Sequence, residues 1–170
     1  RLALSANQHA KNWPEVLRLV RLLDKNKALH PTLAQRLREL GYEDLLSNHA
    51  HDADSIRSIW ASIPQPDRLR PFVALRAAAA FNAHGMHSEA SALVEKALAA
   101  EWDERLVRAW RESAEAEGSP GLLAQIERCE QWRGKRPQDP ELALTLGVFC
   151  LKQKLWGKAQ QNLEEALGDA

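Results

Sequence analysis

Apolar residues along this chain recur at intervals of three and four, and runs that alternate every second residue are almost absent. The first spacing is typical of amphipathic helices, whereas alternation would indicate strands. Leu17, Val20 and Leu23 show the helical spacing near the start of the chain. Prolines and glycines interrupt the pattern after segments of about 11 to 18 residues, a normal helix length. The sequence therefore predicts an all-α protein of about ten helices.

The helical pattern contains an internal repeat. The stretch GMHSEASALVEKAL, residues 85–98, aligns with KLWGKAQQNLEEAL, residues 154–167, and places Ala90 over Ala159. Units of two helices then begin near residues 71, 106 and 140. This spacing is close to the period of the tetratricopeptide repeat, about 34 residues.

The expected architecture is a right-handed superhelical array of antiparallel helix pairs, a tetratricopeptide-like solenoid that runs over residues 1–170. Three regular units fill residues 67–170, and more divergent helix pairs fill residues 1–66. Because the chain opens inside a helical pattern and lacks an initial Met, we interpret it as a fragment of a larger protein.

Small residues mark where paired helices should approach most closely. Ala78 and Gly147 take the small position of a first helix in two of the units. Two antiparallel helices meet most closely where their side chains are smallest. The middle unit fits less well, because Ser113, Gln125 and Trp132 stand where smaller or aliphatic residues are expected.

The N-terminal part is less regular. Residues 11–23 resemble the second helix of a unit, and residues 32–46 resemble a first helix with Gly41 at its small position. The helix expected around residues 55–63 follows late, behind a polar loop. We therefore predict that these two segments form a divergent unit.

The stretch KLWGKA raises the question of whether Trp156 belongs to a binding site. Trp13 and His87 stand at the same place in their units, three residues before the small or aliphatic position. A ring that recurs at one register favours packing over the helix turn rather than contact with a ligand. We interpret Trp156 as such a packing residue.

Composition limits the classes of function. The 23 basic and 23 acidic residues balance, which argues against non-specific nucleic-acid binding. The basic cluster Arg133 to Arg136 lies beside a proline and is interpreted as solvated loop charge. Cys129 and Cys150 fall at apolar helix positions, as buried free thiols do. No apolar run reaches about 18 residues, so no membrane-spanning segment is expected in this chain.

No catalytic motif, metal site or cofactor is predicted. The phosphate-binding, dinucleotide-binding and serine-hydrolase signatures are absent, and the carboxylate pairs lie on polar helix faces. One alternative stays open: His84 and His87, with Met86 between them, surround a turn, and His and Met can ligate haem iron. Both histidines are therefore candidate haem ligands under that alternative only.

A helical repeat array offers a concave groove lined by the first helix of each unit. The groove-facing positions are mainly apolar, with one amide and scattered charge, which suits an extended or helical peptide. The candidate partner-binding residues are Phe72, Leu75, Asn82, Trp110, Glu117, Leu144 and Lys152.

Residues 55–167 resemble a known family. The stretches IWASIPQPDRLRPFVALRAAAAFNAHGMHSEASALVEKALAAEWDERLVRAW and LTLGVFCLKQKLWGKAQQNLEEAL are similar to the C-terminal region of the proteobacterial HemY proteins. The features that carry the resemblance are Trp60 with Pro64, the pair Trp102-Asp103, and the segment Leu155 to Ala159.

The resemblance implies a non-catalytic tetratricopeptide scaffold that acts in late haem (protoporphyrin) biosynthesis. Its partners would be late haem-biosynthesis enzymes, which it would hold or organise at the bacterial inner membrane. Membrane anchoring would come from segments outside this chain, and this region would be a soluble domain on the cytoplasmic side. The alternatives are a protein that binds or transfers haem or porphyrin, and a generic tetratricopeptide adapter of another envelope assembly pathway.

The end of the chain carries one further expectation. A repeat array needs a capping helix with a polar outer face, whereas this chain stops just after the second helix of a unit. We therefore expect a homodimer of this fragment through its C-terminal end.

Overall fold

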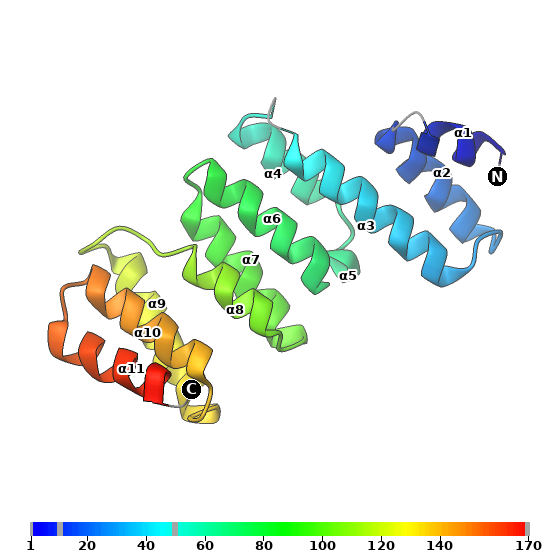
Figure 1. Cartoon of the computed structure of the whole chain (residues 1–170). Helices are drawn as coiled ribbons and strands as arrows, with labels where there is room; N and C mark the ends of the chain where they lie inside the picture. Colours follow the sequence, from blue (N-terminus) through cyan, green and yellow to red (C-terminus); the bar gives the residue numbers. More distant parts are fainter. Residues whose placement is uncertain (1, 10–11, 49–50, 169–170) are drawn as a thin grey trace. The chain divides into compact units, whose positions relative to one another are not determined.

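The computed structural model describes residues 2–9, 12–48 and 51–168 (Figure 1). These residues form eleven α-helices and no strand, which confirms the all-α prediction. None of the described helices combines the length and apolar character that a membrane-spanning helix requires. The helices are α1 (Leu2–His9), α2 (Trp13–Lys25), α3 (Pro31–Ser47), α4 (Ala53–Ser62), α5 (Gln65–Arg68), α6 (Pro71–Ala83), α7 (His87–Ala100), α8 (Glu104–Arg111), α9 (Pro120–Lys135), α10 (Pro140–Lys152) and α11 (Trp156–Gly168).

The chain divides into two compact units, Arg1–Arg68 and Leu69–Ala170. The first unit holds α1 to α5, and the second holds α6 to α11. The candidate groove residues and both candidate haem ligands all belong to the second unit.

Four of the prolines that interrupt the apolar pattern each begin the helix that follows. Proline suits the first turn of a helix because its φ is already helical and its missing N–H has no partner to lose there. Side-chain caps reinforce three of these starts. His30 Nδ1 accepts the Thr32 N–H at 3.2 Å, Ser119 Oγ accepts the Leu122 N–H at 3.1 Å, and Asp139 Oδ1 accepts the Glu141 N–H at 2.9 Å. The helices that begin at proline are those starting at Pro31, Pro71, Pro120 and Pro140.

In the first unit, α3 packs mainly against α2 and only slightly against α4. A Cβ atom at Gly41 would lie 2.9 Å from Leu17 Cδ2, so the absence of a side chain at Gly41 lets α2 and α3 come close. The sequence predicted that residues 32–46 pair with the helix that follows. Helix α3 does contact α4, the following helix of that divergent unit, but it packs more extensively against the preceding α2.

In the second unit, helices pack against the next helix along the chain and also against the next but one. Helix α6 packs against α7 and α8, α8 against α10, and α10 against α9 and α11 (Figure 1). A Cβ at Gly147 would lie 2.7 Å from Leu163 Cδ2 and 3.3 Å from the Leu163 backbone nitrogen. The close approach of α10 and α11 at Gly147 therefore agrees with the small position inferred from the repeat.

The turn that precedes α7 and the turn that precedes α11 have the same backbone conformation. Gly85 and Lys154, which the repeat alignment superimposes, both adopt a positive φ, of 72° and 62°. In each turn the next residue donates its backbone N–H to the carbonyl five residues earlier, Phe81 O at 2.9 Å and Cys150 O at 2.8 Å. This is the hydrogen bonding of a helix end closed by a left-handed residue.

In the middle unit, formed by α8 and α9, two positions where the repeat favours small or aliphatic residues hold Gln125 and Trp132. The Gln125 side chain is only 4% exposed, its Nε2 donates to Ser113 O at 2.8 Å, and its Oε1 accepts the Glu115 N–H at 3.0 Å. The Trp132 ring packs 4.6 Å from the Trp110 ring. Gln125 thus satisfies backbone groups of the irregular segment after α8, which a small residue could not do.

Cys129 and Cys150 are buried free thiols, as the sequence predicted. Burial raises the pKa of Cys129 to about 12, and it also raises the pKa of Cys150. Because only an accessible thiolate reacts readily, we expect both thiols of the folded chain to react with a disulfide reagent more than about a hundredfold slower than in denaturing guanidinium chloride. A thiol of the native chain that reacts at the denatured rate would contradict the burial of these residues.

Candidate functional site

The predicted groove residues lie on α6, α8, α10 and the segment after α8. Phe72 and Leu75 on α6 and Leu144 on α10 are half-buried, which leaves part of each apolar side chain exposed. The Arg76 guanidinium lies 4.7 Å from the centre of the Phe72 ring. We give the name first-helix face to Phe72, Leu75 and Asn82 of α6 together with Leu144 of α10, the positions that the repeat pattern assigns to the groove side.

Asn82 ties three parts of the second unit together. Its Nδ2 donates to Ser113 Oγ at 3.1 Å, and its Oδ1 lies 2.8 Å from His87 Nδ1. Ser113 Oγ in turn donates to Ala109 O at 3.1 Å. The Asn82 amide therefore links α6 to the start of α7 and to the segment that follows α8.

Glu117 and Lys152 are exposed and contribute to a second tether. Lys152 Nζ donates to Ala114 O at 3.2 Å, and Lys154 Nζ lies 3.2 Å from Glu117 Oε1. Gln153 Oε1 also accepts the Gly118 N–H at 3.0 Å. Exposed ion pairs contribute little stability, so the hydrogen bonds to backbone groups dominate this tether.

The structure corrects the placement of Trp110. Its side chain is 0% exposed, with its ring centre 4.6 Å from that of Trp132 and 5.0 Å from that of Phe149. The indole Nε1 donates to Glu95 Oε1 at 3.2 Å. The neighbouring helices supply an aromatic cluster that encloses the ring, so Trp110 belongs to the core and not to an open groove.

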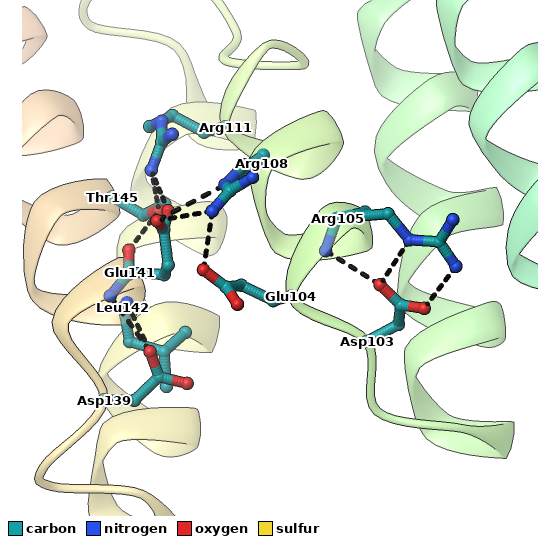
Figure 2. A network of polar contacts seen from close by, with 9 residues as sticks. All are labelled: Asp103, Glu104, Arg105, Arg108, Arg111, Asp139, Glu141, Leu142 and Thr145. Carbon is teal, nitrogen blue, oxygen red and sulfur yellow. Dashed lines mark hydrogen bonds and ion pairs between the residues drawn. The ribbon is translucent and has the colours of Figure 1, made fainter.

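An ion-pair network joins α8 to α10 beside the first-helix face. Figure 2 shows Arg108 and Arg111 reaching from α8 to Glu141 on α10, whereas the pair Asp103–Arg105 lies apart from them. The nitrogen–oxygen distances to Glu141 are 3.3 Å from Arg108 and 3.1 Å from Arg111.

The same network sets the charge of Glu141. Burial alone would raise the pKa of its carboxyl, but the hydrogen bond and charge of Arg111 and the charge of Arg108 outweigh burial and lower that pKa. Glu141 therefore stays ionised and holds the two arginines across the helix pair.

Both His84 and His87 have ring nitrogens in contact with neighbouring polar groups. His84 is exposed and its Nδ1 lies 2.9 Å from Ala80 O, whereas the half-buried His87 contacts Asn82. Within residues 2–9, 12–48 and 51–168, no group of three or more His, Cys, Asp or Glu side chains is arranged to hold a metal ion. Haem ligation by these two histidines stays a prediction.

The structure also corrects the interpretation of Trp156. The ring is 63% exposed, so it does not cover the turn between α10 and α11. Trp13, at the equivalent place in the first unit, does pack partly against a buried cluster. Leu155, which precedes Trp156, and Leu167, which lies on the same helix, are also exposed. Self-association of the chain through this end stays a prediction.

One cavity lies where the sequence indicated no site. A cavity of about 650 Å³ opens between α7 and the last turns of α9. The basic cluster interpreted as loop charge in fact continues α9 as far as Lys135. The spacing of Arg128, Trp132 and Lys135 along one helix would have revealed this stripe. The cavity is lined by Ala92, Glu95, Lys96, Leu98, Ala99, Trp102, Arg128, Trp132, Lys135 and Arg136.

Comparisons with known protein families, curated proteins and solved structures gave no significant match for this chain. The resemblance to the HemY family therefore stays a prediction.

Proposed function

We propose that this chain is a non-catalytic protein-interaction module that holds a protein partner on its first-helix face. The observation that carries the proposal is the lateral linkage of α6, α8 and α10. Asn82 bonds Ser113, Arg111 bonds Glu141, and Lys152 bonds Ala114 O. A linked surface of this kind pre-organises its side chains, which lowers the entropy cost of binding.

The chemistry of the face supports a peptide or helix as the bound element. Phe72, Leu75 and Leu144 each expose part of an apolar side chain. Apolar anchors at helical spacing, surrounded by polar groups, are the pattern by which grooves recognise a helix or an extended segment.

The partner proposed from the HemY resemblance is an enzyme of the last steps of haem synthesis. In this proposal the chain follows the tetratricopeptide pattern, and segments outside it anchor the protein at the bacterial inner membrane with this region on the cytoplasmic side. The turns at Gly85 and Lys154, which share one hydrogen-bond pattern at aligned positions, support the repeat interpretation.

The proposal is tested with purified late haem-synthesis enzymes by titration calorimetry. A double variant, Leu75→Glu with Leu144→Glu, places two charges on the first-helix face. We expect it to bind a partner at least about tenfold more weakly, because burying an unpaired carboxylate costs more than about 1.4 kcal/mol. The matched control is Leu123→Glu on α9, whose leucine is 49% exposed, and it should bind within about twofold of the unchanged chain.

Two results would count against the proposal in different ways. Binding that survives the double variant would remove the first-helix face as the site. No binding to any enzyme of late haem synthesis would remove the haem pathway and favour an adapter of another assembly pathway. Circular dichroism of each variant verifies that the helices remain folded.

A further inference from the structure

We propose that the cavity between α7 and α9, the α7/α9 cavity, binds an acidic peptide segment that carries an apolar side chain. The cavity measures about 650 Å³ and shares no lining residue with the first-helix face. It is therefore a second binding site, independent of the one assigned above.

Two tryptophans, Trp102 and Trp132, line the cavity and form its floor, and packing against buried rings fixes their position. Trp102 and Trp132 meet edge to face, with ring centres 5.6 Å apart and planes at 81°. Trp132 packs in turn on the buried Trp110, which packs on Phe149. Because this stack extends into the core, the two outer rings present a fixed apolar surface, apart from the face of Trp102 over which the Arg136 guanidinium lies. An incoming aromatic or aliphatic side chain could pack on it with little reordering.

The rim of the cavity is basic. Lys96 comes from α7, whereas Arg128, Lys135 and Arg136 come from α9 and its end. The Arg136 side chain is positioned by a ring, with its guanidinium carbon 3.7 Å from the centre of Trp102. Within the described part of the chain, no ion pair engages Lys96, Lys135 or Arg136. The charges of these three side chains are therefore not neutralised by an ion pair.

The one acidic side chain in the lining does not cancel this charge. Glu95 is half-buried, and its Oε1 accepts the Trp110 indole N–H at 3.2 Å. Its carboxylate points to the aromatic stack, and burial raises its pKa, although the Arg128 charge and the Trp110 bond act in the opposite direction. The side chains around the cavity therefore carry a net positive charge next to its apolar floor.

Charge and shape together favour a peptide as the ligand. Basic side chains around an apolar floor complement carboxylates that flank an apolar residue. A nucleic acid fits less well, because the 23 basic residues of the chain are balanced by 23 acidic residues.

The test uses the full 170-residue chain and a fluorescein-labelled peptide in which two glutamates flank a phenylalanine on each side. Fluorescence anisotropy should show saturable binding that weakens as salt is raised. The double variant Lys135→Gln with Arg136→Gln should lower the affinity by at least about tenfold, since it removes two of the charges that face the carboxylates. Replacing the peptide phenylalanine with glycine should weaken binding by about fivefold or more, because the apolar contact is lost.

Two matched variants make the test specific. Lys154→Gln with Lys158→Gln makes the same change in net charge outside the cavity and should bind the peptide within about twofold. Leu144→Glu alters the first-helix face and should leave peptide binding unchanged, which separates this site from the proposed function.

Three outcomes would overturn the inference. They are no saturable binding of the acidic peptide, equal losses in the cavity variant and the distant lysine variant, and tighter binding of a labelled oligothymidylate than of the peptide. The last outcome would assign the cavity to single-stranded nucleic acid, which also combines aromatic stacking with basic groups.

Discussion

Replacing Trp110 with alanine is expected to lower the free energy of unfolding by about 3–5 kcal/mol, the usual cost of removing a large buried ring. The side chain is 0% exposed, contacts Trp132 and Phe149, and holds Glu95 through its indole N–H. Its loss leaves a cavity and a half-buried carboxyl without its indole donor. Urea unfolding followed by far-ultraviolet circular dichroism measures the change.

Trp156→Ala is the matched control for this substitution. Because the Trp156 ring is 63% exposed, its removal should change the free energy of unfolding by less than about 0.5 kcal/mol. Similar losses for the two variants would contradict both corrections, the burial of Trp110 and the exposure of Trp156.

The second large effect is expected at Gly147, where α10 and α11 approach each other. Gly147→Leu should lower the free energy of unfolding by about 3 kcal/mol, the upper part of the range for overpacked cores. Even a Cβ there would lie 2.7 Å from Leu163 Cδ2 and 3.3 Å from the Leu163 backbone nitrogen, so the helices must separate to admit a longer side chain. Thermal and urea unfolding of the variant measure the loss.

A matched change separates overpacking from the general effect of replacing glycine. Gly157→Leu lies on α11, where a Cβ would meet nothing within 4 Å. It should be neutral or stabilising by up to about 1 kcal/mol, because leucine is the better helix former. Combining Gly147→Leu with Leu163→Ala should restore part of the lost stability, since the removed side chain makes room. A Gly147 variant as stable as the unchanged chain would contradict the close approach.

The helical content and its breaks were predictable because they depend on local chemistry. Proline restricts φ and supplies no N–H, so each proline after an apolar run implied a break, and four helices begin at such residues. The equivalence of Gly85 and Lys154 could also be read from the sequence. The alignment that matches Ala90 with Ala159 also matches these two turn residues.

Partner helices were harder to predict, because pairing depends on distant residues. Gly41 was recognised as a small position, but nothing in residues 32–46 shows that Leu17 of the preceding helix fills the space beside it. In the middle pair, Gln125 looked like a poor fit to the repeat. Its role comes from Ser113 and Glu115, whose backbone groups it satisfies only once the segment after α8 has folded back.

The candidate site shows the same limit. Periodicity assigns a residue to a side of its helix, but it does not show which neighbours cover that side. Trp110 was placed on the groove side, and Trp132 and Phe149 enclose it. The α7/α9 cavity was missed because its tryptophans come from different segments, Trp102 after α7 and Trp132 near the end of α9.

The proposed role of the first-helix face is tested most directly by photo-crosslinking from position 144. A photoreactive phenylalanine analogue replaces Leu144 in cells that make the whole protein, and the same analogue at Leu123 on α9 is the control. We expect irradiation to join position 144, but not position 123, to an enzyme of late haem synthesis. A product that forms equally from both positions, or no such enzyme attached at position 144, would contradict the proposed interaction.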